Sequence, residues 1–234
     1  RLFFRRNFFT AGLDLLVRRG FDRLAGRSED GAFYLTQAMG GGKTHSLIAL
    51  GLLAAEPGLR REVVPEIASG AAFGAAKVVV FSGHQNPETL LWGHIAEQLG
   101  RGQVMAPFWR AGAKTPGIDE WVTALGTEPV LILLDELPSY LQMARGEPVG
   151  QSTLGDITVG ALERLFNALP RCPRAAVVVT NLKDDIYLDG SRSRRALARS
   201  LRCSANFPIR SRMSGSRPCS RIARRSGISR SGSR

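Results

Sequence analysis

Hydrophobic and polar positions divide the chain into short apolar runs and longer segments with helical spacing. Four short apolar runs predict strands, and their nearly continuous apolar character is typical of parallel strands that are buried on both faces. The predicted strands are AFYLTQ (32–37), KVVVFSG (77–83), PVLILLDE (129–136) and AAVVVTN (175–181).

Apolar residues at steps of three and four predict helices in the segments between these strands. The first helix is NFFTAGLDLLVRRGFDRLA (7–25), and the second begins at Lys43 and ends near Ala55, before Pro57. Three further helices are predicted at 87–100, 118–126 and 159–170.

Strands that alternate with helices predict an α/β fold, in which a parallel sheet with right-handed crossovers forms the middle layer of a three-layer sandwich. Ligands of such sheets bind at the carboxyl ends of the strands. Three polar sequences, QAMGGGKT, DE and TN, fall at the ends of three predicted strands. We therefore expect these sequences to meet at one edge of the sheet and to form the functional site.

Composition divides the chain into three parts. We predict an N-terminal helical segment at 1–28, the α/β core at 29–190 and an Arg/Ser-rich tail at 191–234. The 234 residues carry a net charge of +12, but the tail supplies 13 Arg and contains no Lys, Asp or Glu. The residues before the tail hold 19 basic and 20 acidic side chains, so a nearly neutral core gives no support to DNA binding.

The tail combines 13 Arg and 12 Ser in 44 residues and shows no apolar periodicity beyond Leu201. Such a composition cannot build a core, so we predict that the tail is disordered. One interpretation is an arginine-rich arm that binds nucleic-acid phosphates. The other is out-of-frame translation of a GC-rich gene, which we favour because the composition changes abruptly and lysine is absent. We base no function on the tail.

The remaining composition indicates a cytoplasmic protein that does not enter a membrane. No apolar run is long enough to span a bilayer, and no basic-then-apolar signal sequence opens the chain. The three cysteines lack metal-site or disulfide spacing, which suits a reducing compartment. Because the chain opens on Arg1 within an aromatic and basic segment, we expect a fragment of a longer protein.

The sequence MGGGKT, between a predicted strand and a predicted helix, is typical of a Walker A phosphate loop. Consecutive glycines let the backbone turn its N–H groups toward phosphate oxygens, and the helix that follows adds its positive end. We expect Lys43 to contact the β- and γ-phosphates of ATP and the Thr44 hydroxyl to ligate Mg²⁺. The expected nucleotide-binding residues are Ala38, Met39, Gly40, Gly41, Gly42, Lys43, Thr44 and His45.

One position departs from the phosphate-loop pattern. Gln37 stands where the motif G-x-x-x-x-G-K-[ST] has its first glycine. This glycine eases the turn from strand to loop, so Gln37 bears on how the chain enters the loop rather than on the phosphate contacts of residues 40–44. The alternative interpretation is a glycine-rich helix-entry turn that precedes a surface lysine.

The strand VLILLDE ends in two acidic residues, as a Walker B strand does. We expect Asp135 to lie beside Mg²⁺, usually through a water, and Glu136 to polarise the water that attacks the γ-phosphate. An acidic strand end exposed to solvent is the alternative. Lys43 and Asp135 are 92 residues apart, which leaves room for a strand and helices between them. Such an insertion is typical of the P-loop ATPases that have an extra strand between the two motifs.

The strand AAVVVTN supplies a third polar end. A polar residue here, beside the Asp-Glu strand, would hold the attacking water or sense the γ-phosphate. Asn181 is our first candidate for this role and Thr180 the second. A turn-forming asparagine is an equally good interpretation of Asn181.

Several segments together resemble a family of large bacterial and archaeal AAA-like ATP-binding proteins. The resemblance lies in FFRRNFFTAGLDLLVRRGFDRLAG, LTQAMGGGKTHSLIALGLLA, LLWGHIAEQLG and VLILLDELPSYL, spans about 2–190 and stops at the tail. The family was long catalogued as a domain of unknown function, and its genes often lie beside DNA methylase genes in anti-phage defence clusters. The resemblance implies a P-loop ATPase module and a longer protein, with the lid and partner-binding domains outside this chain.

The function that we expect is Mg²⁺-dependent ATP hydrolysis by a module of a larger cytoplasmic protein that acts in anti-phage defence or DNA modification. Such a module would work with protein partners or by self-assembly. One alternative is a scaffold or regulatory subunit that binds ATP without hydrolysing it, although Glu136 favours hydrolysis. Another alternative is nucleic-acid binding through the Arg/Ser tail. The adjacent Asp135 and Glu136 argue against a small-molecule kinase.

Overall fold

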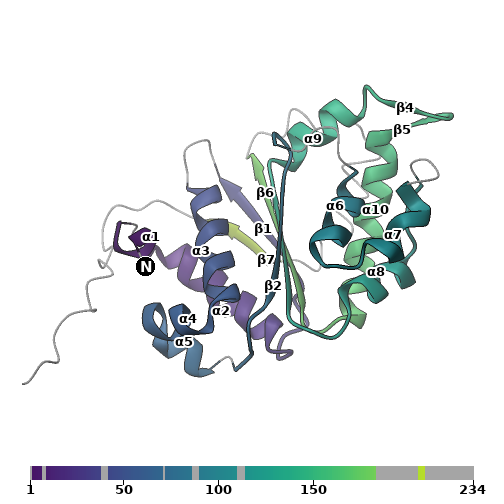
Figure 1. The fold of residues 1–234 in the computed structure, drawn as a ribbon. Coiled ribbons are helices and arrows are strands. Elements are labelled where there is room, and N and C mark those ends of the chain that lie inside the picture. The colour runs from purple at the N-terminus through teal and green to yellow at the C-terminus, as the bar shows by residue number, and fades with distance from the viewer. Residues whose placement is uncertain are drawn as a thin grey trace, which may run out of the picture.

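The computed structural model describes residues 2–6, 9–37, 42–70, 72–85, 90–109, 114–182 and 205–208. Its centre is a parallel sheet with the strand order β2-β3-β6-β1-β7 (Figure 1). The chain therefore returns between β3 and β1 to insert β6. The strands are β1 (Ala32–Gln37), β2 (Lys77–Ser82), β3 (Val130–Asp135), β6 (Ala175–Leu182) and β7 (Ala205–Pro208).

Helices cover both faces of this sheet, so the described part of the chain is a three-layer α/β sandwich (Figure 1). One face carries α1 (Leu2–Arg6), α2 (Ala11–Leu24), α3 (Lys43–Ala55), α4 (Pro57–Val63) and α5 (Pro65–Gly70). The other face carries α6 (Leu91–Gln98), α7 (Gly102–Trp109), α8 (Ile118–Leu125), α9 (Leu137–Ala144), α10 (Leu154–Ala168) and the 3₁₀ helix η1 (Leu169–Arg171). The hairpin of β4 (Pro148–Val149) and β5 (Ser152–Thr153) follows α9.

The central strand β3 is buried along its whole length and sends alternate side chains to opposite layers. Leu131 and Leu133 pack in the core beneath α3, whereas Ile132 and Leu134 pack in the core beneath α6 and α10. The same alternation assigns Asp135, at the end of β3, to the α3 side of the sheet. Period-two geometry therefore brings the last residue of β3 toward the start of α3.

Helix α3 lies close against the sheet. A Cβ atom on Gly51 would lie 3.1 Å from Leu133 Cδ1 and 3.5 Å from Val78 Cγ1, so glycine permits close contact with β3 and β2. The N-terminal helix α2 joins the same core through buried apolar residues, among them Leu16, Val17 and Phe21. The helical segment at 1–28 and the α/β part thus share one hydrophobic layer.

The C-terminal end of α3 is fixed by a buried arginine, Arg60 of α4. Its guanidinium donates hydrogen bonds to the carbonyl oxygens of Leu53 and Ala54 in α3 and of Phe73 and Gly74 in the segment before β2. Burial lowers the Arg60 pKa to about 10, which leaves the side chain charged at neutral pH. A cation at a helix C-terminus is favourable, so Arg60 fixes the end of α3 that lies farthest from the loop.

The structure confirms the positions of the strands predicted at 32–37, 77–83, 129–136 and 175–181 and of the helix predicted at 43–55, to within one residue at each end. The strand at 77–82, predicted to be buried on both faces, is instead the edge strand β2, in which only Val79 and Phe81 are buried. The helix predicted at 159–170 begins earlier, at Leu154, because the Thr153 hydroxyl accepts a hydrogen bond from Asp156 N and caps it. Between β3 and the helix predicted at 159, where the apolar pattern predicts no helix or strand, the chain forms α9 and the β4–β5 hairpin. Short elements of this kind carry little periodicity.

The tail also differs from its prediction at one place. Residues 205–208, within the segment predicted to be disordered, form β7 and pair in parallel with β1. Without β7, β1 would be an edge strand with unpaired backbone groups, and pairing with them requires only an extended backbone. The rest of 191–234 lies outside the described residues.

Across the described residues, no helix combines the length and the apolar character needed to cross a membrane.

Candidate functional site

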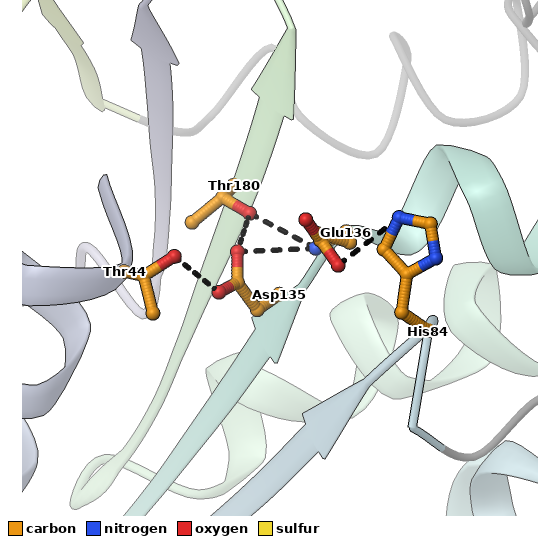
Figure 2. A network of polar contacts seen from close by, with 5 residues as sticks. All are labelled: Thr44, His84, Asp135, Glu136 and Thr180. Carbon is orange, nitrogen blue, oxygen red and sulfur yellow. Dashed lines mark hydrogen bonds and ion pairs between the residues drawn. The ribbon is translucent and has the colours of Figure 1, made fainter. Parts of the chain in front are cut away.

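Polar side chains from three separate parts of the sequence meet where β3 and β6 end and α3 begins (Figure 2). They are Thr44 at the start of α3, Asp135 and Glu136 at the end of β3, and Thr180 near the end of β6. The structure therefore brings the predicted phosphate-loop helix, the acidic pair and the third polar strand end together at one sheet edge.

Asp135 is the centre of this arrangement, and only 9% of its surface is exposed. Its Oδ2 accepts a 2.8 Å hydrogen bond from the Thr44 hydroxyl, although the two residues are 91 positions apart. Its Oδ1 accepts hydrogen bonds from the Thr180 hydroxyl at 2.5 Å and from Glu136 N at 3.1 Å. A carboxylate with both oxygens engaged has a fixed orientation.

Thr180 connects the two acidic residues. Its side chain is buried, and its hydroxyl donates to Asp135 and accepts a 3.1 Å hydrogen bond from Glu136 N. Alternation along β6 explains this placement, because Ala176 and Val178 pack in the α3-side core and Thr180 continues their series. Thr180 thus fixes the carboxylate of one acid and the backbone of the next.

Glu136 has a left-handed backbone conformation, with φ 53° and ψ 34°. It is the one non-glycine residue with positive φ among the described residues, and such a conformation costs free energy that neighbouring contacts must offset. Its carboxylate lies beside His84, with Oε2 3.3 Å from His84 Nε2 (Figure 2). Both side chains are well exposed, at 46% and 64%, so this pair contributes little stability.

Gly42, at the described end of the predicted phosphate loop, has the backbone conformation that a glycine favours. Gly42 has φ 77° and is the N-cap residue of α3, a left-handed conformation that glycine adopts without strain. Its carbonyl accepts hydrogen bonds from Ser46 N and Ser46 Oγ, which fixes the first turn of α3. Lys43 is the first helical residue and is half-buried. The predicted contact residues Ala38, Met39, Gly40 and Gly41 lie outside the described residues.

The structure describes two further predicted site residues, His45 and Asn181, to different extents. His45 is exposed, and its ring stacks on Phe3 of α1 with 6.0 Å between centroids, so it ties α1 to the start of α3. For Asn181, the structure describes only the backbone, which pairs with Thr36 of β1. Its predicted role beside the γ-phosphate stays a prediction.

The oxygen atoms of Thr44 and Asp135 suit a hard cation such as Mg²⁺. This ion binds through one or two protein oxygens and completes its octahedron with waters and phosphate oxygens. Within the described residues, no cluster of three or more His, Cys, Asp or Glu side chains forms a self-contained metal site. A hydroxyl and one carboxylate fit an ion that arrives with a phosphate ligand.

Sequence patterns ranked Thr180 below Asn181 and gave no role to the residues that surround Glu136. Alternation of side chains along β6 could have identified Thr180, because it puts Thr180 on the same side of the sheet as Asp135. The signal for the other contacts was the polar sequence SGHQN at the end of β2, where Ser82 pairs with Asp135 and Gly83 N donates to Asp135 O at 3.0 Å. Comparison with protein-family models found no matching family, and comparison with curated proteins found no matching relative.

Proposed function

We propose that this chain is an Mg²⁺-dependent ATPase module. The observation that carries the proposal is the hydrogen bond between the Thr44 hydroxyl and the Asp135 carboxylate. Thr44 ends a GGGKT sequence and Asp135 ends an apolar strand, so two motifs that predict phosphate and metal binding independently have their key oxygen atoms in contact.

The strand order gives further support. The strand β2 lies between the two motifs in the sequence, which is the insertion expected for the class of P-loop ATPases with an extra strand between the Walker motifs. In the sheet, β6 separates β1 from β3. The motif residues also follow the carboxyl ends of β1 and β3, where ligands of parallel sheets bind.

Each residue has a distinct role in the proposed reaction. The N-terminus of α3 and Lys43 would bind the phosphates through backbone dipoles and a positive charge. Thr44 and Asp135 would hold the Mg²⁺ that accompanies ATP, which spreads the negative charge of the β- and γ-phosphates. Glu136, which follows Asp135 in the sequence and whose side chain is 46% exposed, would accept the proton of the attacking water.

The larger setting is proposed from the sequence resemblance. The GGGKTHS sequence and the LLWGHIAEQLG helix resemble AAA-like proteins encoded in anti-phage defence and DNA methylase gene clusters. We propose that ATP hydrolysis here drives a step of such a system through protein partners or self-assembly.

Substitution of Lys43 tests the nucleotide site. The Lys43→Ala protein should lose ATP binding, measured by titration with a fluorescent ATP analogue, because the cation that pairs with the phosphates is gone. The exposed Lys114, which lies before α8, gives a matched control, Lys114→Ala. Retained ATP affinity in Lys43→Ala would exclude a phosphate loop at this position.

Substitution of Glu136 separates hydrolysis from binding. Glu136→Gln should bind Mg-ATP with unchanged affinity and release phosphate at least about 100-fold more slowly, as expected when a general base is lost. Phosphate release and analogue binding are measured on the same preparations. If the wild-type chain binds ATP and neither protein releases phosphate, the module is an ATP-binding scaffold and the hydrolytic role of Glu136 is wrong.

A further inference from the structure

Gly83, the first residue after β2, lies in unusually close contact with the backbone of Glu136. A Cβ atom at Gly83 would lie 2.3 Å from the Glu136 carbonyl oxygen, 3.1 Å from the carbonyl carbon and 2.9 Å from Tyr140 Cβ. Two of these atoms belong to the backbone and the third is attached directly to it, so rotation of a side chain cannot relieve the clash. Any residue other than glycine would therefore displace Glu136 or β2.

Together with hydrogen bonds on either side, the contact with Gly83 fixes the backbone conformation of Glu136. On its N-terminal side, Glu136 N donates to Asp135 Oδ1 and to the Thr180 hydroxyl. On its C-terminal side, the Glu136 carbonyl lies against Gly83 and accepts a 3.4 Å hydrogen bond from Tyr140 N in the first turn of α9. The left-handed conformation of Glu136 is thus held at both ends.

Gly83 is itself fixed in place. Its N–H donates a 3.0 Å hydrogen bond to Asp135 O, and it is buried. Tyr140 packs edge to face against Phe81 of β2, with 5.0 Å between ring centroids, so α9 packs against β2 beside this contact. A displacement caused by a side chain at Gly83 would pass mainly to the turn at Glu136, because Phe81 and Tyr140 are buried in the core.

We propose that Gly83 is a positioning residue for Glu136, a role that rests on the proposed ATPase function. Its missing side chain lets the end of β2 lie against the Glu136 carbonyl, and this contact sets the direction in which the Glu136 carboxylate leaves the backbone. The three atoms nearest to a Cβ at Gly83 belong to Glu136 and Tyr140, and none of them to Thr44 or to the side chain of Asp135. Gly83 acts on the base and leaves the phosphate and metal contacts in place.

The test is Gly83→Ala in the full chain, with Gly58→Ala as the matched control. Gly58 lies in α4, and a Cβ there meets no atom within 4 Å. Gly83→Ala should lower kcat for ATP roughly 100-fold, the effect of misplacing a catalytic group by about 1 Å, and leave the Kd for Mg-ATP within about threefold of wild type. Gly58→Ala should change neither quantity.

A double variant establishes that the effect passes through Glu136. In the Glu136→Gln background, Gly83→Ala should produce no further loss of kcat, because the group that it displaces is already inactive. Unchanged kcat in Gly83→Ala would overturn the positioning role and leave the ATPase proposal intact. Parallel loss of Mg-ATP binding and turnover would also overturn it, since Gly83 would then be needed for packing in general. Equal turnover by wild type and Glu136→Gln would instead refute the proposed function of Glu136.

Discussion

Replacement of Thr180 by valine tests how the two acidic residues are held. Valine has nearly the shape of threonine, so the substitution removes the hydroxyl group and preserves the packing of β6. The hydroxyl forms two hydrogen bonds, one to Asp135 Oδ1 and one from Glu136 N, and it is buried at 1% exposure. Water cannot replace it readily.

The magnitude of the effect follows from these two bonds. A hydrogen bond to a charged carboxylate contributes about 1.5–3 kcal/mol and a neutral one about 0.5–1.5 kcal/mol. Asp135 keeps its hydrogen bonds from Thr44 and Glu136 N, so both of its carboxylate oxygens still have a donor. We therefore expect Thr180→Val to lower the free energy of unfolding by about 2–4 kcal/mol, a large share of the ~5–15 kcal/mol of a typical domain.

The measurement is urea-induced unfolding at neutral pH, followed by far-ultraviolet circular dichroism. A shift of the midpoint at constant m-value reports the change in stability. Thr180→Ser is the matched control, because it keeps the hydroxyl and loses one buried methyl group, at a cost of about 1 kcal/mol. A cycle of Thr180→Val, Asp135→Ala and the double variant then isolates the coupling between the two side chains, expected at about 1.5–3 kcal/mol.

Two results would refute this reasoning. Thr180→Val could unfold at the wild-type midpoint, in which case the hydroxyl contributes no net stability at this position. Alternatively, Thr180→Ser could be as destabilised as Thr180→Val, in which case the methyl group and not the hydroxyl is responsible. A coupling energy near zero in the cycle would assign any stability change to other neighbours of Thr180.

Two other predictions concern the contacts that hold α3 and β2. Arg60→Met should lower the free energy of unfolding by about 2–4 kcal/mol, because it removes four hydrogen bonds to carbonyl oxygens, of which only Ala54 O keeps another donor among the described residues, Ala76 N. Arg61→Met, at an exposed position, should be nearly neutral. Chemical denaturation compares the two variants, and equal stabilities would contradict the capping role of Arg60. Gln98 of α6 pairs with both backbone groups of the edge residue Val80, at 3.0 and 2.8 Å, as a neighbouring strand would. Gln98→Met should therefore speed amide hydrogen exchange at Val80 roughly two- to tenfold. Glu97→Met, at an exposed position, should leave the exchange rate unchanged. Equal exchange rates in the two variants would show that Gln98 does not protect the amide of Val80.

Long elements with strong patterns could be predicted from the sequence because their periodicity reflects burial. The run VLILLDE predicts a strand buried on both faces, and β3 is such a strand. Short elements such as α9 and the β4–β5 hairpin could not be predicted, since a few residues contain less than one full period of either pattern. The pairing of β7 with β1 depends on backbone groups, which no pattern of side chains records.

Some features of the candidate site could likewise be predicted from side-chain patterns, and others could not. Alternation along β3 and β6 implies that Asp135 and Thr180 share one side of the sheet, and the GKT sequence puts Thr44 at the helix that covers this side, so their meeting could have been derived. The left-handed turn at Glu136 could not, because glutamate has no preference for positive φ and the conformation is imposed by contacts distant in sequence. Gly83 is the one residue whose type indicates, in the sequence, that the backbone at Glu136 lies close to β2. A glycine at the end of a strand indicates a close backbone approach, and the substitution of Gly83 by alanine determines whether this approach governs the position of the base.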